Sequence, residues 1–325
     1  MFCILMSSDF QPIAIYMILT FIFYPIKSLD FESDGKSKLI KELVKNEISL
    51  YSAHTNLDYT KDGVSFELAK TLGLKNIEFL QPQEGNQNKL VVYVPKSHLE
   101  KVSDAIFNAG GGVIGEYSKC SSSSSVHGTF KGSLETNPTI GIANNFEIVE
   151  EIRLEVLVNS WELNKVINAI KLIHPYEQPV YDVFILNNKN VNYGAGAIGN
   201  LSPNMTTATF LKHIKTSLKT DSFSYTFGKN SKIKKVAVCG GSCSEMFNFA
   251  ISQGADAFIT ADVKFHTFQD AENRIMLVDA GHYETEVPVL NKLKSKLVQF
   301  FQKQNSEYKV FKYSGSTNPV KFYNK

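Results

Sequence analysis

The sequence has few cysteines and no paired cysteine motif. Its four cysteines, Cys3, Cys120, Cys239 and Cys243, form no CxxC pair. This excludes an evident disulfide framework and predicts a reducing compartment, the cytoplasm. Cys239 and Cys243 flank a Gly-Gly turn, and this spacing is compatible with a structural role or with a metal or redox role.

The sequence also lacks an excess of charge of either sign. The formal net charge is +2, from 34 Lys and Arg against 32 Asp and Glu, which argues against nucleic acid as a partner. Lysines concentrate only between Lys212 and Lys235, as a solvated face or an anion-binding patch. Charged residues make up 20% of the chain and hydrophobic residues 43%, as in a soluble globular protein. The 325 residues allow two domains.

No apolar run has the length of a membrane span. The segment Ile13–Ile26 carries no charge, but a spanning helix needs about 20 apolar residues. A secretory signal needs a basic start, and residues 1–12 contain only Asp9 as a charge. We therefore expect a buried strand and loop in this segment and no membrane association. A signal or anchor, or a disordered or mis-specified terminus, are the alternatives.

Helical and extended patterns alternate along most of the chain, which predicts an α/β fold with a mostly parallel sheet. Helices are predicted at 34–47, 64–72, 206–218, 244–253 and 287–303, and strands at 48–52, 233–239, 257–260 and 275–279. The glycine-rich segment 194–199 is predicted to be a turn, and it matches no dinucleotide fingerprint.

A polar linker at 81–88 separates this pattern from a different one. The next hundred residues predict a βαβ–βαβ order, which is typical of a ferredoxin-like unit. Its predicted strands are 89–94, 113–117, 146–158 and 180–186, its helices are 97–109 and 161–173, and Ser121–Ser125 is predicted to be a polar loop. The domains are therefore predicted as 1–82 for the first part of the core, 83–188 for the insert and 189–325 for the second part of the core.

Two polar clusters directly follow apolar runs. The first is SAHTNLD at 52–58, and the second is DAGHYETE at 279–286. In open α/β sheets, ligands bind where strands end, so the two clusters predict one shared site. Imidazole and carboxylate side chains together suit a divalent zinc, manganese or iron ion better than calcium.

Three side chains in these clusters are candidate metal ligands: Asp58, His282 and Glu286. We expect His282 to end a strand and Glu286 to open the following helix, so that the ion would lie across the turn. The alternatives are a structural pair or a helix cap for His282 and Glu286, and an Asx turn before Gly63 for Asp58.

Other histidines are candidates for proton transfer. His54 is predicted either to orient the loop by hydrogen bonding or to bind the metal directly. His266 is predicted to line the pocket as a general acid or base, with a surface helix position as the alternative. The stretch HPYEQP at 174–179 contains two prolines and is predicted to bend the chain before the next strand. It is predicted to be a structural bend or subunit contact, or else a ligand-facing loop.

Several motifs in this order resemble the NIF-three-like family, also known as GTP cyclohydrolase I type 2 homologues. In the core these are SAHTNLD, DGV, VAVCGGS, ITAD, FHTFQDAENRI and DAGHYETE. In the insert they are GGVIGEYSKCS, NPTIG and HPYEQPVYDV, which resemble the extra domain of the longer bacterial members.

The resemblance implies an α/β fold with an inserted domain similar to PII and CutA proteins. It also implies a toroidal homohexamer, built as a trimer of dimers, with two divalent metal ions facing an internal cavity. Carried over to this chain, Asp58 would be a bridging metal ligand, and His282 and Glu286 would be ligands. The family's proposed activity is metal-dependent hydrolysis of a nucleotide-like or cyclic small molecule.

The chain departs from the family pattern near its start. Members carry a His-His-Pro stretch before a segment like Phe21–Leu29, but no histidine precedes His54 in this chain, which resembles an N-terminally shortened form. Three protein ligands suffice for one metal ion, so one ion or none is expected in place of two. The predicted function is a metal-dependent hydrolase of unknown substrate. The alternative is a non-catalytic ring-forming scaffold, metal carrier or regulatory protein with a degraded metal site.

Overall fold

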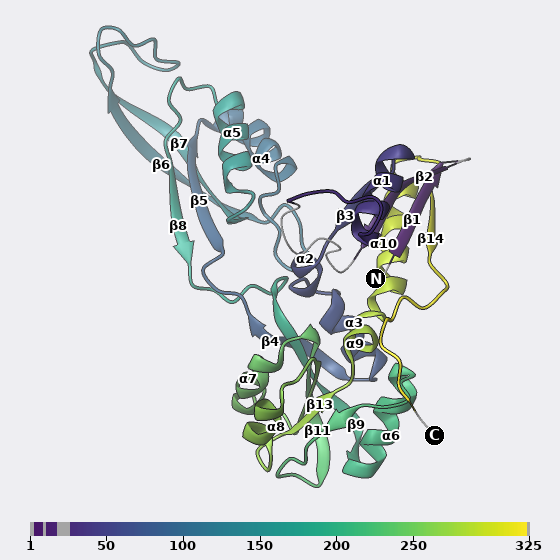
Figure 1. Cartoon of the computed structure of the whole chain (residues 1–325). Coiled ribbons are helices and arrows are strands. Elements are labelled where there is room, and N and C mark those ends of the chain that lie inside the picture. The colour runs from purple at the N-terminus through teal and green to yellow at the C-terminus, as the bar shows by residue number, and fades with distance from the viewer. Residues whose placement is uncertain (1–2, 9–10, 18–26, 324–325) are drawn as a thin grey trace. The chain divides into compact units, whose positions relative to one another are not determined.

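The chain forms two compact units. The first combines Met1–Gln81 with Tyr193–Lys325, and the second is Pro82–Asn192 (Figure 1). The sequence predicts 83–188 for the insert. Each unit has its own hydrophobic core.

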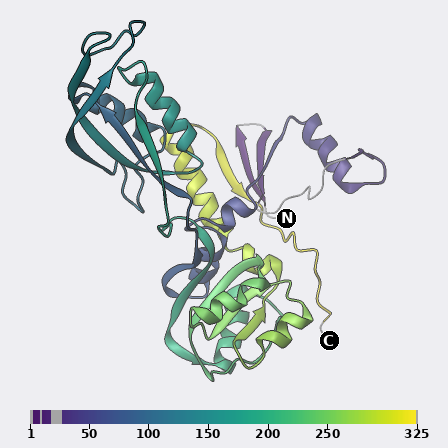
Figure 2. The same cartoon turned by 90° about the vertical axis from the view of Figure 1, so that its left-hand side faces the viewer.

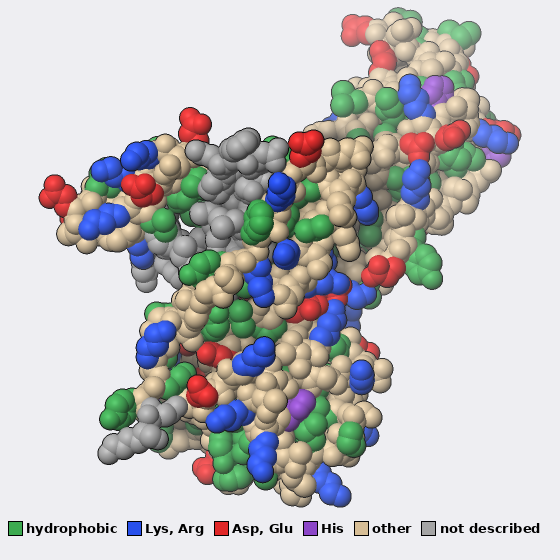
Figure 3. Space-filling view, turned by 90° about the vertical axis from the view of Figure 1, so that its right-hand side faces the viewer, with side chains coloured by type: hydrophobic (Ala, Val, Ile, Leu, Met, Phe, Trp, Pro, Cys, Tyr) green, Lys and Arg blue, Asp and Glu red, His purple; other side chains and the backbone are tan. Residues whose placement is uncertain are grey.

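The computed structural model describes residues 3–8, 11–17 and 27–323. Part of the apolar stretch Ile13–Ile26 therefore lies outside the described residues, although its first residues belong to a strand. No helix in the described part of the chain is both long and apolar enough to cross a membrane. On the face shown in Figure 3, Lys and Arg side chains are interspersed with Asp and Glu and form no continuous basic band.

A six-stranded sheet forms the centre of the first unit. Its order is β10 (Ser224–Tyr225), β13 (Met276–Asp279), β12 (Ala257–Ala261), β11 (Lys232–Ser242), β9 (Gly194–Thr206) and β4 (Lys75–Pro82). The strands β11, β12 and β13 are parallel, whereas β9 pairs antiparallel with β11 and β10 pairs antiparallel with β13. The predicted α/β class is confirmed, and the parallel part of the sheet is its centre.

Side chains of the central strands alternate between two hydrophobic clusters because successive strand residues point to opposite faces. Val236 and Val238 pack into one cluster with α3 (Val64–Thr71) and α6 (Thr207–Leu218). Ala237 packs into the other. Figure 1 shows α6 on one side of the sheet, with α7 (Phe247–Ser252) and α8 (Phe265–Ala271) on the other. Both faces are covered, so the strands are apolar throughout rather than alternating.

The helix α6 illustrates how local signals set an element. Thr206 caps its start by accepting a hydrogen bond from the Thr209 N–H, at 3.3 Å. Phe210, Ile214 and Leu218 are buried at a spacing of four residues, which places them on one face. The helix covers the range that the sequence predicts.

A second, four-stranded sheet completes the first unit, in the order β14 (Lys309–Lys312), β1 (Cys3–Ser8), β2 (Gln11–Met17) and β3 (Ser49–Ser52). The strands β1, β2 and β14 lie side by side (Figure 2). The parallel pair β2–β3 is connected through α1 (Gly35–Lys45). The helix α10 (Val289–Lys303) contributes Val289, Leu290 and Leu293 to a small core that includes Val310 of β14.

The second unit has the order β-α-β-β-α-β. Its elements are β5 (Gln87–Val94), α4 (Leu99–Asn108), β6 (Ser121–Lys131), β7 (Phe146–Asn159), α5 (Leu163–Ile173) and β8 (Tyr181–Leu186), with a short 3₁₀ turn, η1 (Lys96–His98), before α4. The four strands pair antiparallel in the order β6-β7-β5-β8. Both helices contribute to one core under the sheet, through Val102 and Ile106 of α4 and Val166 and Ile170 of α5.

Two local predictions for this second unit are wrong. The serine run Ser121–Ser125 opens β6 rather than forming a loop, and Val113–Tyr117 is a turn with a single bridge between Ile114 and Tyr117. The serines pair through their backbones with β7 and keep their side chains exposed, so their polarity does not oppose an edge strand. The low β-propensity of serine was outweighed by a long neighbouring strand.

The glycine-rich segment 194–199 is a strand, not a turn. A Cβ on Gly194 would lie 2.7 Å from the carbonyl oxygen of Gln81, and one on Gly199 would lie 2.9 Å from that of Lys75. Glycine is required there because neighbouring backbone approaches so closely.

Candidate functional site

The carboxyl ends of the parallel strands meet at one edge of the six-stranded sheet. The strand β11 ends in Gly240-Gly241-Ser242, β12 is followed by Asp262, and β13 ends at Asp279. Two residues, Ala280 and Gly281, separate β13 from the helix α9 (His282–Glu286), and Gly281 has a φ of +91°. Polar side chains from separate strands are therefore gathered at the edge where ligands bind in open α/β sheets.

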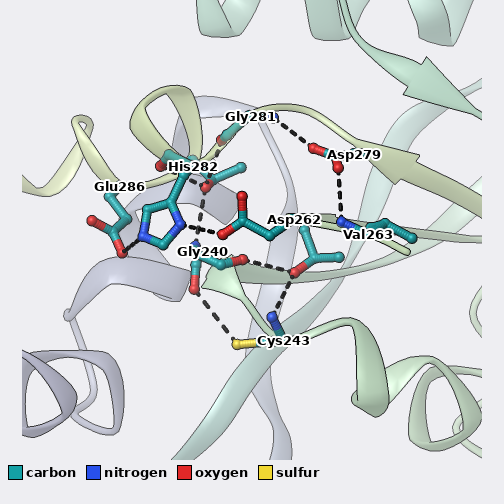
Figure 4. A network of polar contacts seen from close by, with 11 residues as sticks. Gly240, Cys243, Asp262, Val263, Asp279, Gly281, His282 and Glu286 are labelled. Carbon is teal, nitrogen blue, oxygen red and sulfur yellow. Dashed lines mark hydrogen bonds and ion pairs between the residues drawn. The ribbon is translucent and has the colours of Figure 1, made fainter. Parts of the chain in front are cut away.

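His282 lies between two carboxylates (Figure 4). Its Nδ1 is 2.5 Å from Oδ2 of Asp262, within hydrogen-bond distance. Its Nε2 is 3.1 Å from Oε1 of Glu286, without the angles of a hydrogen bond. Both partners raise the pKa of His282 to about 9, with Glu286 contributing most and burial opposing. The imidazole is therefore held between two negative groups.

The arrangement of α9 corrects one prediction. His282 and Glu286 belong to the same short helix, so they lie on one face at a spacing of four residues. His282 does not end the strand β13, which stops at Asp279. The Asp279 carboxylate instead accepts hydrogen bonds from the N–H groups of Val263 and Gly281, at 2.8 and 3.1 Å. It fixes the turn from which α9 starts.

Asp58 reaches the same cluster from the short helix α2 (Thr55–Asp58). Burial raises the pKa of Asp58 to about 7; the Glu286 carboxylate adds to this rise and His282 opposes it. Its Oδ1 is buried and accepts no hydrogen bond, so that oxygen does not form the Asx turn considered as an alternative. Asp58 therefore lies close enough to Glu286 and His282 to interact with both through their charges.

The double glycine at the end of β11 makes room for these side chains. Gly241 has a φ of +70°, and a Cβ there would lie 2.7 Å from Oε1 of Glu286 and 3.4 Å from Nε2 of His282. A Cβ on Gly240 would overlap Cγ1 of Val64 in α3. The site therefore depends on two residues without side chains.

Two threonines hold the glycine turn in place. The Gly241 N–H donates to Oγ1 of Thr285, at 3.0 Å, and the Thr260 hydroxyl donates to the Gly241 carbonyl oxygen, at 2.9 Å. Thr260 in turn accepts a hydrogen bond from the Cys243 N–H, at 3.2 Å. These contacts connect β11, β12 and α9, so the backbone beneath the cluster is rigidly supported.

The nearby cysteines have structural environments. Cys239 is buried, with its Sγ 3.9 Å from Sδ of Met246. The Cys243 thiol lies 3.6 Å from the Gly240 carbonyl oxygen. Hydrogen bonding to Cys239, followed by burial, raises the pKa of Cys243. The thiol is held in its protonated, unreactive form.

The two histidines predicted to transfer protons have different positions. His54 is at the N-terminus of α2, with a φ of +38°, and its Nδ1 is 2.9 Å from Oγ1 of Thr55. His266 is exposed on α8, where its Nδ1 lies 3.1 Å from Oε1 of Gln269 and its ring contacts Phe265. These contacts match the surface-helix alternative considered for His266.

Asp262 is a site residue that the sequence analysis missed. It has a φ of +55°, in the left-handed region that non-glycine residues rarely adopt, and its carboxylate pairs with His282. The signal was present, because Asp262 directly follows the buried strand β12. Its partner lies 20 residues away in sequence, so the pairing itself had no local signature.

A pocket of about 450 Å³ opens beside the cluster. His282 and Asp262 line it together with aromatic residues and part of the C-terminal segment, of which Asn318 donates to Oε1 of Glu284 at 3.0 Å. Pockets of this size accommodate small molecules. His282 and Asp262 therefore form part of the wall of this pocket.

A family model described as Duf34/NIF3 (NGG1p interacting factor 3) matches residues 17–319. The chain belongs to the Duf34/NIF3 family. Two curated members named GTP cyclohydrolase 1 type 2 homolog are similar to it. The protein from Halalkalibacterium halodurans is 37% identical over 93% of this chain and 81% of its own length. The protein from Staphylococcus epidermidis is 36% identical over 89% and 79%.

The same family relationship is seen among solved structures. The Bacillus cereus protein described as related to NIF3 superposes with a TM-score of 0.79 and 34% identity, covering 96% of this chain and 84% of its own. The fold described above is therefore that of the Duf34/NIF3 family.

The donors in this Duf34/NIF3 chain match a divalent ion in chemistry but form no complete coordination shell. Three of their atoms, Asp58 Oδ1, His282 Nε2 and Glu286 Oε2, are buried without hydrogen-bond partners. Imidazole nitrogen and carboxylate oxygen bind zinc, manganese and iron. Among residues 27–323, whose side chains the structure describes, no three His, Cys, Asp or Glu side chains are however grouped closely enough to hold a metal ion.

Proposed function

We propose that this protein is a metal-dependent hydrolase in which Asp58, His282 and Glu286 hold a divalent zinc, manganese or iron ion. The observation that carries this function is the set of three buried donor atoms on these side chains that make no hydrogen bond. Each unpaired buried polar group costs about 1–3 kcal/mol, so a shared partner would recover a substantial free energy. Three protein donors support one ion with an open position for substrate or water.

The surrounding residues would tune the donors. Asp262 accepts the Nδ1 hydrogen of His282, so loss of the other ring proton on metal binding would leave Nε2 as the donor. Gly241 leaves the space in which the Glu286 carboxylate and the imidazole edge meet. A bound divalent ion supplies Lewis acidity, which polarises a substrate oxygen and acidifies water at neutral pH. His54 is the candidate for moving the proton, because it precedes Asp58 in the same loop and helix.

The substrate is proposed to be a small molecule that enters the pocket beside His282. The relatives carry the name GTP cyclohydrolase 1 type 2 homolog, which makes guanine nucleotides and cyclic nucleotides the first compounds to assay. Phe223, Tyr283 and Phe322 line the pocket and could stack against a base.

The decisive measurement is the metal content per chain of protein purified without chelator, followed by titration of stripped protein with zinc, manganese and iron. Glu286→Gln should weaken binding by about tenfold or more, because a neutral amide replaces a charged ligand. Glu284→Gln is the matched control, since Glu284 is in the same helix and its carboxylate bonds to Asn318 instead. Undiminished metal binding in Glu286→Gln would remove Glu286 from the ligand set.

A non-catalytic scaffold, metal carrier or regulatory protein is the second candidate. It is favoured by the lack of a complete three-residue metal group in the described ranges. Turnover that is abolished by EDTA and restored by one metal would support the hydrolase. Metal binding without turnover of any compound in the panel would support the carrier.

We also propose that the chain assembles as a homo-oligomer, a hexamer built as a trimer of dimers, in the cytoplasm. Phe265 and Phe311 are exposed large aromatic residues of the first unit that an interface could cover. Cys120, Cys239 and Cys243 are free, as expected in a reducing compartment. Light scattering after size-exclusion chromatography measures the assembly directly, and a monomer at micromolar concentration would refute it.

A further inference from the structure

The unit Pro82–Asn192 contains a pocket of its own, of about 630 Å³. Its walls come from β6, β7, the loop that joins them, and the bend HPYEQP that precedes β8. The loop and the bend are tied together, because the Thr139 hydroxyl donates to the Pro175 carbonyl oxygen, at 2.6 Å, and the Asn137 N–H donates to Oε2 of Glu177, at 3.3 Å. The size is typical of small-molecule sites.

A buried carboxylate faces this pocket. Glu151 of β7 lines it and is only 8% exposed. None of the ion pairs formed by the described residues includes Glu151. Burying a carboxylate without a counter-charge is costly, and a protein retains one mainly where something binds to it.

The fold makes space for this carboxylate. A Cβ on Gly128, in the neighbouring strand β6, would overlap Oε2 of Glu151. The absence of a side chain at Gly128 therefore allows the carboxylate to occupy the pocket wall between the two strands.

A second polar group lies beside it. The Tyr176 hydroxyl is buried and lines the same pocket. Burial, followed by hydrogen bonding and charge from the neighbouring Glu151 carboxylate, raises the pKa of Tyr176, so it remains a protonated phenol.

Tyr176 is held in place by His174. The His174 Nε2–H donates to the Tyr93 carbonyl oxygen, at 2.9 Å, and its Nδ1 accepts from the Tyr176 N–H, at 3.1 Å. The two rings also pack edge to face, with centroids 5.0 Å apart. His174 is thus the structural part of the bend, and Tyr176 is its ligand-facing part.

The charge of the lining selects the ligand class. Three carboxylates, Glu151, Glu177 and Asp182, face one amine, Lys131, and the rest of the wall is largely apolar. We propose that this pocket binds a small organic cation, an amidinium, guanidinium or protonated amine on an apolar body, whose charged end donates hydrogen bonds to Glu151 and Tyr176. Charge-assisted hydrogen bonds to a buried carboxylate are among the strongest that a protein forms.

The full-length chain is titrated by calorimetry with three compounds of one shape: benzamidine, benzamide and benzoate. Benzamidine should bind saturably, benzamide about tenfold or more weaker, and benzoate not measurably, because only the cation pairs with the buried carboxylate. Agmatine and spermidine extend the panel to guanidinium and amine compounds without an aromatic ring.

Glu151→Gln should weaken benzamidine binding by about tenfold or more. The matched control is Glu150→Gln, since Glu150 is adjacent in β7 but its side chain is 92% exposed; it should bind as the wild type does. Without ligand, Glu151→Gln should raise the thermal midpoint, because it removes an uncompensated buried charge. If Glu151→Gln does not fold, Gly128→Ala provides the test instead. Its methyl group should displace the Glu151 carboxylate without removing the charge, and benzamidine binding should weaken.

A cation site is refuted by equal binding of benzamidine and benzoate, by unchanged affinity in both Glu151→Gln and Gly128→Ala, or by no saturable binding of any cation in the panel. Preferential cation binding that is lost in these variants and retained in Glu150→Gln confirms it.

Discussion

Gly241→Ala tests whether the tight packing around Glu286 defines the site. An alanine at a φ of +70° is strained by about 1–2 kcal/mol. Its Cβ would also lie 2.7 Å from Oε1 of Glu286, which is 4% exposed and cannot easily move away. Such overpacking costs about 1–3 kcal/mol. The total loss in the free energy of unfolding should therefore be about 2–5 kcal/mol.

Gly254→Ala separates the two contributions. Gly254 has nearly the same φ, +72°, and a Cβ there meets nothing within 4 Å. Its loss should be the strain alone, about 1–2 kcal/mol. Both variants lie in the same compact unit, so urea unfolding followed by circular dichroism compares them directly. Equal losses in Gly241→Ala and Gly254→Ala would refute the steric reasoning.

The same pair of variants reports on the proposed metal site. A methyl group that pushes Oε1 of Glu286 aside should weaken metal binding in Gly241→Ala and leave it unchanged in Gly254→Ala. If Gly241→Ala loses the expected stability but binds metal normally, the packing analysis holds and Glu286 is not a ligand.

Three further predictions concern the rest of the chain. Burial lowers the pKa of His174 below 6.5, so its stabilisation of the insert should be complete above about pH 6.5 and decrease as the pH falls through the lowered pKa. The only tryptophan, Trp161, is in this unit and reports its unfolding by fluorescence; a pH-independent midpoint from pH 7 to 5 would contradict this. Phe258→Ala, at a fully buried position, should cost about 3–5 kcal/mol of unfolding free energy, against about 0.5 kcal/mol or less for Phe249→Ala at a position that is 44% exposed. Asp34→Ala removes the cap of α1 and should destabilise that helix, seen as faster hydrogen exchange in that helix alone; unchanged exchange would rule out a capping role.

Much of the fold was predictable because its signals are local. Thr206 before the spaced apolar residues of α6, and Asp34 before α1, are short-range patterns that specify where helices begin. The apolar run of β12 predicts a strand buried on both faces. Asp58, His282 and Glu286 could be selected for the same reason, since polar residues directly after strands mark the ligand-binding edge of an α/β sheet.

Other features of the fold depend on which distant segment of the chain packs beside them. The serine run in β6 is a strand because β7 offers a ladder of backbone partners, and the glycines of β9 are extended because adjacent backbone leaves no space for side chains. No periodicity within either segment encodes its neighbour. Local propensity was therefore overridden by tertiary pairing.

The sequence by itself determined the α/β class, the core helices and the residue types that could bind a metal. Both signals, the hydrophobic periodicity and the polar residues that follow strands, depend only on residues close together in the sequence. Only the tertiary structure decided that Asp262 pairs with His282, that Gly241 makes room for Glu286, and that Gly128 makes room for Glu151. Each of these contacts joins segments whose distance is set by the packing of the whole domain, so no local pattern of residues can specify it.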